Sequence, residues 1–134
     1  MSKPILCLDF DGVIHSYKSG WKGADVIPDP PVAGAISFIV KATDDFDVQI
    51  YSSRSGQEGG IRAMQDWLSL WLRERYRDAP VDFDHAAETL VKWPTEKPPA
   101  MVTIDDRAIT FTGEWPDMET LKAFKPWNRK EASQ

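Results

Sequence analysis

Short apolar runs that end abruptly in polar residues recur along this chain. The first run, Ile5–Leu8, follows Pro4 and ends in Asp9-Phe10-Asp11-Gly12. Two later runs, Phe46–Tyr51 and Met101–Ile104, also end in polar residues. Runs of this length between turn signals predict β-strands with buried side chains. Three strands are therefore expected, each followed by a polar turn.

Between these runs, apolar residues recur at helical spacing. This pattern predicts helices at Pro31–Ala42, where Pro31 suits the first turn, and at Glu58–Tyr76. A shorter helix is predicted at Met118–Phe124. Because strands and helices alternate, we expect an α/β fold with a mostly parallel sheet. The predicted architecture is a three-layer Rossmann-like core with crossover helices.

Two further segments have a weaker pattern. Thr89–Lys92 is consistent with a short strand inside an otherwise polar, proline-containing region. Ile109–Phe111 is either another short strand or one arm of a turn at Gly113. We expect a single domain over residues 1–127 and a polar tail at residues 128–134.

The stretch of residues 13–31 is rich in glycine and proline and long for a connection in a compact domain. Long loops often carry function, so we interpret it as a flap over the site at the end of the first strand. The alternative is a solvated surface loop. Tyr17, Lys18, Trp21 and Lys22 lie within it.

Composition limits the class of protein. The chain has 134 residues, 42% of them hydrophobic, which is enough for one domain with a real core. A formal net charge of -5 argues against a protein that coats nucleic acid. The one cysteine, Cys7, excludes a disulfide scaffold. With no apolar run of the roughly 18 residues that span a membrane and no signal-peptide pattern, we expect a cytoplasmic protein without a membrane partner.

Polar residues of a particular kind follow the predicted strands. Asp9 and Asp11 follow the first, Ser52 the second and Asp105-Asp106 the third. The carboxyl ends of parallel strands meet at one edge of a sheet, so these groups should converge. Two close carboxylates repel each other unless a cation or a shared proton offsets them. Together with Lys97, they predict a phosphoryl-transfer site with Mg²⁺.

In these motifs the chain resembles the haloacid dehalogenase superfamily, in its phosphatase branch, over roughly residues 4–116. Asp9-Phe10-Asp11-Gly12-Val13 matches the first motif of the family. The resemblance implies that Asp9 is the nucleophile that accepts the phosphoryl group and that Asp11 is the general acid–base. It also implies a magnesium-dependent phosphomonoesterase, here without the large cap domain that many relatives carry.

The resemblance implies roles for the other motif residues as well. Ser52 matches the hydroxyl that binds the transferring phosphoryl group, and its neighbours Ser53 and Arg54 join it as predicted phosphate ligands. Lys97 matches the lysine that balances charge on nucleophile and phosphate. Lys92 competes for this role, but Lys97 is nearer the third strand. Arg54 can instead pair with a neighbouring carboxylate.

The fourth motif completes the predicted metal site. Asp105 and Asp106 match its acidic pair, which would hold Mg²⁺ with Asp9 and the backbone carbonyl of Asp11. Which of the two is the direct ligand stays open, with Asp106 preferred. We further predict that a neighbouring carboxylate raises the pKa of Asp11, whereas the metal and Lys97 lower that of Asp9.

Other assignments for the motif fit less well. A calcium loop would need ligands after Gly12, where the sequence has Val-Ile-His. A P-loop fails because Tyr17 stands where a glycine is required. A phosphoacceptor signalling domain normally has its aspartate on an internal strand. The alternative that remains is a phosphate-binding or regulatory module with little turnover.

The sequence leaves two substrate classes open. A site without a cap suits a larger or end-on substrate, such as a nucleic-acid end, whereas the flap can select a nucleotide or another small phosphate ester. His15 and His85 are interpreted as flap or surface residues rather than catalysts. Trp21 and Trp115 either stack on a ring of a ligand or cover the core.

Overall fold

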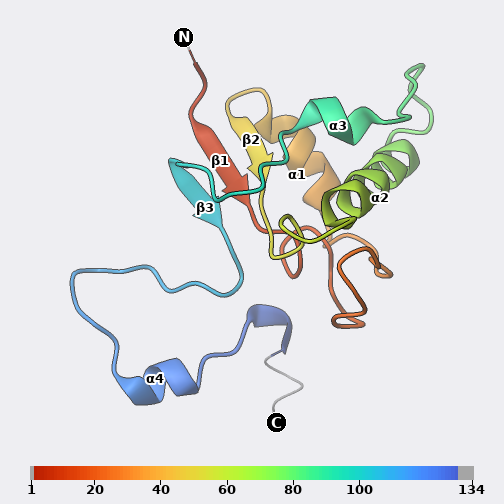
Figure 1. Cartoon of the computed structure of the whole chain (residues 1–134). Coiled ribbons are helices and arrows are strands. Elements are labelled where there is room, and N and C mark those ends of the chain that lie inside the picture. The colour runs from red at the N-terminus through yellow and green to blue at the C-terminus, as the bar shows by residue number, and fades with distance from the viewer. Residues whose placement is uncertain (1, 130–134) are drawn as a thin grey trace.

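The computed structural model of the chain describes residues 2–129, and its sheet is parallel (Figure 1). The strands are β1 (Ile5–Leu8), β2 (Asp47–Ile50) and β3 (Val102–Ile104), in the order β2-β1-β3. Both neighbouring pairs run parallel, with Leu8 opposite Ile50 on one side and Ile104 on the other. The predicted α/β class and parallel sheet are therefore confirmed, and each of the three apolar runs contains a strand.

Within residues 2–129, four helices and one 3-10 helix accompany the sheet. They are α1 (Ala35–Ala42), α2 (Gly60–Arg75), α3 (Ala86–Leu90), α4 (Met118–Lys122) and η1 (Trp127–Arg129). Of the described residues, none lies in a helix that is both long and apolar enough to cross a membrane.

Helices α1 and α2 begin later than predicted, and a glycine explains each start. Gly34 precedes α1 with φ of 84°, and Gly59 precedes α2 with φ of 77°. Glycine adopts this left-handed conformation without the Cβ clash that other residues suffer. Pro31 does not open α1 as predicted, because it forms a bridge with His15, and the Val32 N–H donates to the carbonyl of Ile14.

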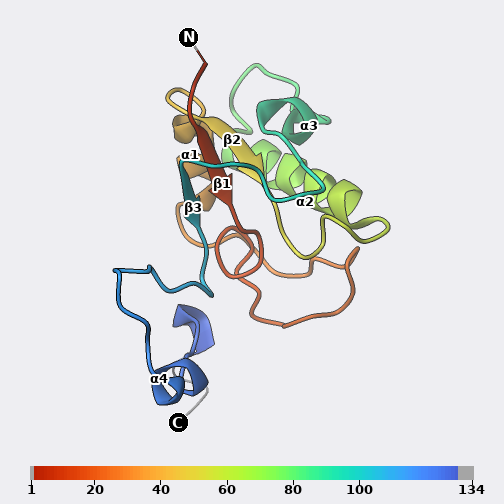
Figure 2. The same ribbon diagram turned by 60° about the vertical axis from the view of Figure 1, so that its left-hand side comes forward.

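Helices α1, α2 and α3 pack on one face of the sheet. Leu6 and Leu8 of β1 and their neighbours Val48 and Ile50 of β2 point to this face. The helical side chains that meet them in one buried cluster are Ile36, Ile39, Met64, Trp67, Leu68, Leu72 and Ala87. Figure 2 shows α1, α2 and α3 behind the strands. Burial of these apolar side chains is the main force that orders the domain.

The opposite face of the sheet lacks a helical layer in the part of the chain described. Residues 91–101 cross in front of the strands before entering β3 (Figure 2). Prolines at positions 94, 98 and 99 keep this crossing segment from becoming a helix. The structure is thus a small α/β fold, and the prediction of a full three-layer core is not met.

The two weakly patterned segments are not strands. Helix α3 ends at Leu90, and only Lys92 forms an isolated parallel bridge, with Gln49 of β2. A contact between residues distant in sequence stabilises α3, because the Ala87 N–H donates to Ser69 Oγ at 3.0 Å. Ile109–Phe111 is irregular.

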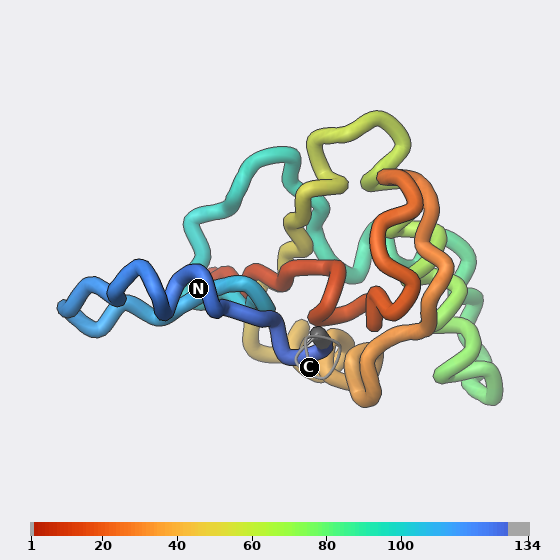
Figure 3. The backbone as a smooth tube through the Cα atoms, turned by 90° about the horizontal axis from the view of Figure 1, so that it is seen from below, coloured from red at the N-terminus to blue at the C-terminus, as the bar shows by residue number. Residues whose placement is uncertain are grey.

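The segment after β3 runs out from the sheet and then returns (Figure 3). Its exposed apolar side chains are Ile109, Phe111, Trp115, Met118, Leu121 and Phe124. The return is made by η1, where Trp127 Nε1 donates to the Gly12 carbonyl at 2.7 Å and Asn128 Nδ2 to the Ser16 carbonyl at 3.1 Å. Of the predicted tail, residues 128–129 thus belong to η1, and residues 130–134 lie outside the described part.

Candidate functional site

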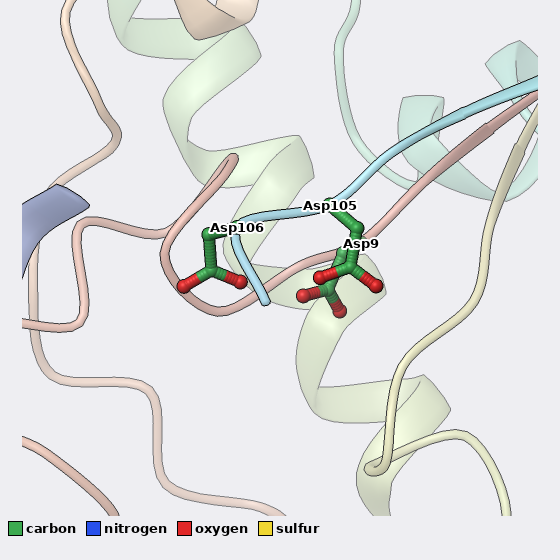
Figure 4. Close-up of side chains that lie close together, drawn as sticks. All are labelled: Asp9, Asp105 and Asp106. Carbon is green, nitrogen blue, oxygen red and sulfur yellow. The ribbon is translucent and has the colours of Figure 1, made fainter. Parts of the chain in front are cut away.

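Three carboxylates gather at the carboxyl end of the sheet. Asp9 follows β1, and Asp105 and Asp106 follow β3 (Figure 4). One oxygen from each lies within 4.8 Å of the others. The Asp9 N–H donates to the Ile104 carbonyl at 3.0 Å, which ties the two strand ends together. The predicted convergence of these residues is therefore present.

Of the acidic pair, Asp106 is the better-placed candidate for a metal ligand. Its Oδ1 is buried and finds no hydrogen-bond partner among the described residues. Such an orphaned acceptor is costly unless a cation or water satisfies it. Asp105 is exposed, and its Oδ1 already accepts from the Arg107 N–H at 2.9 Å. This difference agrees with the preference for Asp106.

Gly12 leaves the room that Asp106 occupies. Its φ is +83°, and a Cβ at this position would lie 2.8 Å from Cγ of Asp106 and still closer to Oδ2. Any larger residue would therefore push against the Asp106 carboxylate and strain the backbone. The glycine of the first motif thus has a packing role as well as a turn role.

Burial and mutual repulsion disfavour charge on these carboxylates. Burial, with the neighbouring Asp105 and Asp106, raises the pKa of Asp9 from 3.8 to about 8. Burial likewise raises the pKa of Asp106. A divalent cation would remove both penalties, and hard carboxylate oxygens are what Mg²⁺ prefers. The donor set therefore fits the metal that the sequence predicts.

Asp11 has a different environment, because a buried arginine and a histidine hold it. Arg54 donates from Nε to Oδ2 at 2.9 Å and from Nη2 to Oδ1 at 3.1 Å. His15 Nδ1 lies 2.9 Å from Oδ1. Burial by itself raises the pKa of Asp11, but these hydrogen bonds and the Arg54 charge outweigh it and lower the pKa below its ordinary value. The prediction of a raised pKa for Asp11 is therefore wrong.

The hydrogen bonds of His15 define its tautomer. The Asp29 N–H lies 3.1 Å from His15 Nε2. A backbone N–H can only donate, so Nε2 accepts and Nδ1 carries the hydrogen that it donates to Asp11. The ring is fully buried against Phe10 and Trp67. His15 is therefore a flap residue that orients Asp11, and the surface interpretation is wrong for it.

Arg54 also anchors the flap. Its Nη1 donates to the carbonyls of Gly23, Ala24 and Val26 at 2.8–3.2 Å. The guanidinium carbon lies 4.7 Å from the centre of the Trp21 ring. The side chain is 0% exposed, so of its two predicted roles the structure shows the pairing with a carboxylate. This geometry offers a substrate phosphate no exposed guanidinium surface, which contradicts the phosphate-binding role.

The two serines that follow β2 have different environments, one buried and one at the cleft. Ser52 is buried, and its Oγ accepts from the Arg54 N–H at 2.9 Å. Ser53 is exposed and lines the cleft described below. The sequence assigned both to phosphate, and Ser53 is the one that faces open space.

The two candidate lysines lie in different places. Lys92 forms an ion pair of 3.0 Å with Asp47 at the start of β2, at the opposite end of the strand from Ser52. Lys97 is exposed on the crossing segment beside β1. Burial raises the pKa of Cys7, and the nearby Lys97 charge opposes this shift. Lys97 is thus the better candidate, and its contact with Asp9 stays a prediction.

A cleft of about 360 Å³ opens beside the carboxylates. Its lining residues are Asp9, Asp11, Tyr17, Trp21, Ser53, Asp105 and Arg107. Acidic groups, two aromatic rings, a hydroxyl and a cation thus share one space. A larger cavity of about 620 Å³ lies between the end of α2 and α3. None of its lining residues lines the cleft beside the carboxylates.

Two residues, Asp29 and Arg107, gain a place in the site that sequence reasoning did not give them. Asp29 holds His15, its carboxylate accepts from Ser19, and its carbonyl accepts from Trp67 Nε1 at 3.0 Å. Arg107 brings a cation into the cleft. Its position directly after the fourth motif was a usable signal, whereas Asp29, between two prolines of the flap, offered none.

Comparison with known proteins finds no matching family model, no similar curated protein and no similar solved structure.

Proposed function

We propose that this chain is a magnesium-dependent phosphomonoester hydrolase of the haloacid dehalogenase type, with Asp9 as nucleophile. The observation that carries the proposal is the meeting of Asp9, Asp105 and Asp106 within 4.8 Å at the carboxyl end of a parallel sheet. Beside them, Arg54 and His15 hold Asp11 apart as a separate carboxylate. Two aspartates one residue apart thus have unlike environments, as unlike chemical roles require.

Asp9, Asp106 and Asp105 would hold the metal, with the Asp11 carbonyl as a further oxygen. Bound Mg²⁺ would neutralise charge on the phosphate and on the carboxylates that surround it. Each of the three side chains can supply a carboxylate oxygen. The Oδ1 of Asp106, which finds no hydrogen-bond partner among the described residues, supports this assignment most directly.

The reaction divides into two displacements at phosphorus. An Asp9 oxygen attacks the phosphoryl group, and the ester oxygen leaves with its electron pair and takes a proton from Asp11. Water then attacks the aspartyl phosphate, gives its proton to Asp11, and frees phosphate and the Asp9 carboxylate. Pairing with Arg54 favours the charged form of Asp11. Asp11 is therefore already in the basic form that the attack of water requires. The rate of the first displacement should depend on how acidic the leaving alcohol is.

The phosphate needs cationic and hydroxyl partners. Arg107 and Ser53 line the cleft with Asp9 and are its exposed candidates. The resemblance also names Ser52, which follows β2, and Lys97 of the crossing segment as phosphate partners. Since Cys7 is buried and the chain has no second cysteine, we place the protein in a reducing compartment, the cytoplasm.

Phosphate release from an aryl phosphate, with and without Mg²⁺, tests the proposal. We expect release that needs the metal and that Asp9→Asn abolishes. Asp45→Asn is the matched control, because Asp45 is exposed at the turn before β2, at the opposite end of the sheet. Equal release by the Asp9→Asn variant would refute the nucleophile, and release without any metal would refute the metal site.

The pairing of Asp11 with Arg54 favours one other candidate, a phosphate-binding module with little turnover. A carboxylate held as the anion protonates a leaving group poorly. Metal-dependent binding of phosphate without release from any ester, with Mg²⁺, Mn²⁺ or Co²⁺, would favour this module over the enzyme.

A further inference from the structure

Two aromatic side chains of the flap face the candidate active site. Tyr17 and Trp21 line the cleft together with Asp9 and Asp11. In the described structure neither ring belongs to the buried core cluster or packs against it as a partly buried member. Of the two interpretations open for Trp21, covering the core is thereby disfavoured.

The position of Trp21 is linked to that of Asp11. Its ring stacks on the Arg54 guanidinium at 4.7 Å, and Arg54 is buried and bonded to Asp11. The carbonyls of Gly23 and Ala24 bind the same guanidinium, so the backbone after Trp21 is also held. Arg54 therefore fixes the position of the Trp21 ring relative to Asp11, the acid–base candidate.

Part of the Trp21 ring stays open although Arg54 covers one side. Trp21 is 46% exposed, and the exposed surface borders the cleft. Covering this exposed apolar surface with a ligand removes it from water, which is favourable. A planar aromatic group of the ligand would do so, because stacking on indole is favourable for every base or aryl ring.

Tyr17 is held in a conformation that few tyrosines adopt. Its φ is 61°, in the left-handed region that carries a steric cost for residues other than glycine. The Gly20 N–H donates to its carbonyl at 3.2 Å, and its ring meets His15 at 5.9 Å between centres. A residue kept at such a cost beside a cleft is a candidate for contact with the ligand.

We propose that Tyr17 and Trp21 select phosphomonoesters whose leaving alcohol carries a planar aromatic ring, with nucleoside monophosphates as the substrate class. The inference rests on the proposed function. The two rings border the same cleft as the nucleophile, and Arg107 supplies a cation there. A nucleotide offers both features that this lining matches, an anionic phosphate and a flat base.

A pair of substrates with the same leaving oxygen isolates the effect of the base. Adenosine 5'-monophosphate and ribose 5-phosphate both release a primary alcohol of ribose, and only the first has a base. We expect kcat/KM to favour the nucleotide by roughly 10-fold, in line with stacking on one ring. Trp21→Ala should remove most of this preference, and Trp21→Phe, which keeps a ring, should restore part of it.

Two further variants complete the test. Tyr17→Asn removes the ring and keeps a residue that tolerates a positive φ, so a reduced preference reports the ring rather than backbone strain. Trp115→Ala is the matched control, because Trp115 is 85% exposed and lies outside the cleft lining. It should leave the preference of the wild-type protein unchanged.

The outcomes separate the inference from the proposed function. Equal kcat/KM for the two substrates, or a preference unchanged in Trp21→Ala, would overturn the inference and leave the phosphatase standing. If neither substrate is hydrolysed, the affinities of the two compounds with Mg²⁺ are compared in the same variants. Equal affinity would then overturn the inference, and tighter, Trp21-dependent binding of the nucleotide would support it without turnover.

Discussion

Arg54 holds Asp11 through two hydrogen bonds, from Nε to Oδ2 at 2.9 Å and from Nη2 to Oδ1 at 3.1 Å. The Arg54 side chain is 0% exposed and that of Asp11 15%. The same guanidinium binds the carbonyls of Gly23, Ala24 and Val26. One side chain thus orients the acid–base candidate and holds the backbone of residues 23–26.

Arg54→Met should therefore destabilise the protein strongly. The substitution leaves the Asp11 carboxylate buried without its partner and frees the flap carbonyls, which we expect to cost about 3–5 kcal/mol of unfolding free energy. Urea denaturation followed by circular dichroism measures the change. Arg73→Met is the control, because its pair with Asp84 is exposed and should contribute less than about 1 kcal/mol. Equal losses in both variants would contradict the anchoring role.

The hydrogen bond from His15 should tune the ionisation of Asp11. His15→Leu removes a donor that lowers the pKa of Asp11, so that pKa should rise toward its ordinary value. Because the attack of water on the aspartyl phosphate needs Asp11 as the anion, the acid limb of kcat should move to higher pH. His15→Asn offers an amide donor near the same place and should keep the limb closer to that of the wild type. A shift of equal size in both variants would argue for a general packing effect instead.

Gly12 should not tolerate a side chain. Gly12→Ala brings a Cβ against the Asp106 carboxylate and leaves a non-glycine residue at a φ of +83°. The strained backbone alone costs about 1–3 kcal/mol, and displaced Asp106 should weaken Mg²⁺ binding as well. Thermal unfolding and metal titration measure the two effects. Gly56→Ala is the control, since a Cβ there meets nothing within 4 Å, and a similar loss in it would refute the packing argument.

The carboxylate cluster predicts how stability depends on pH and metal. The folded pKa of Asp9, about 8, exceeds the ordinary 3.8, so without metal the folded state binds the extra proton between these values. Its contribution to stability is complete below about pH 4 and falls as pH rises to about 8. Thermal unfolding in chelator should show this loss in the wild type and a smaller one in Asp9→Asn. Mg²⁺ should stabilise most at the alkaline end, and an equal effect of Mg²⁺ at pH 5 and pH 8 would contradict the assignment.

The strands and the acidic motifs could be predicted from the sequence because each is contained in a short contiguous segment. An apolar run followed by Asp9-Phe10-Asp11 contains both the buried strand and the groups at its end. Parallel pairing then brings residues after β3 to the same edge, which follows from topology without knowledge of side chains. The convergence of Asp9 with Asp106 was therefore predictable.

The support of Asp11 was not readable, because it depends on contacts across the fold. Arg54 is 43 positions away, and its other partners are backbone carbonyls that show no sequence signal. The role of His15 depends on a backbone N–H of Asp29 that the flap conformation brings to Nε2. The predicted pKa of Asp11 is wrong for this reason, since that prediction rests on a neighbouring carboxylate, whereas hydrogen bonds from His15 and Arg54 lower the pKa.

The prediction of secondary structure was wrong where contacts between residues distant in sequence outweighed local preference. Thr89–Lys92 has strand-like composition, yet Ser69 caps the Ala87 N–H and Trp93 Nε1 donates to the Ala87 carbonyl at 2.8 Å. These bonds stabilise the short helix α3. The missing helical layer has a local cause, the prolines of the crossing segment, and was open to prediction.

Trapping a phosphoryl group on Asp9 tests the central claim most directly. Asp11→Asn should slow the attack of water on the aspartyl phosphate and let it accumulate when substrate and Mg²⁺ are added. After acid quenching, reduction with borohydride should convert residue 9 to homoserine, which peptide mass spectrometry identifies. The account predicts this product at residue 9, with none in Asp9→Asn treated in the same way. Substrate turnover by the wild type with no modification at residue 9 in Asp11→Asn, or the label at Asp105 or Asp106, would contradict it.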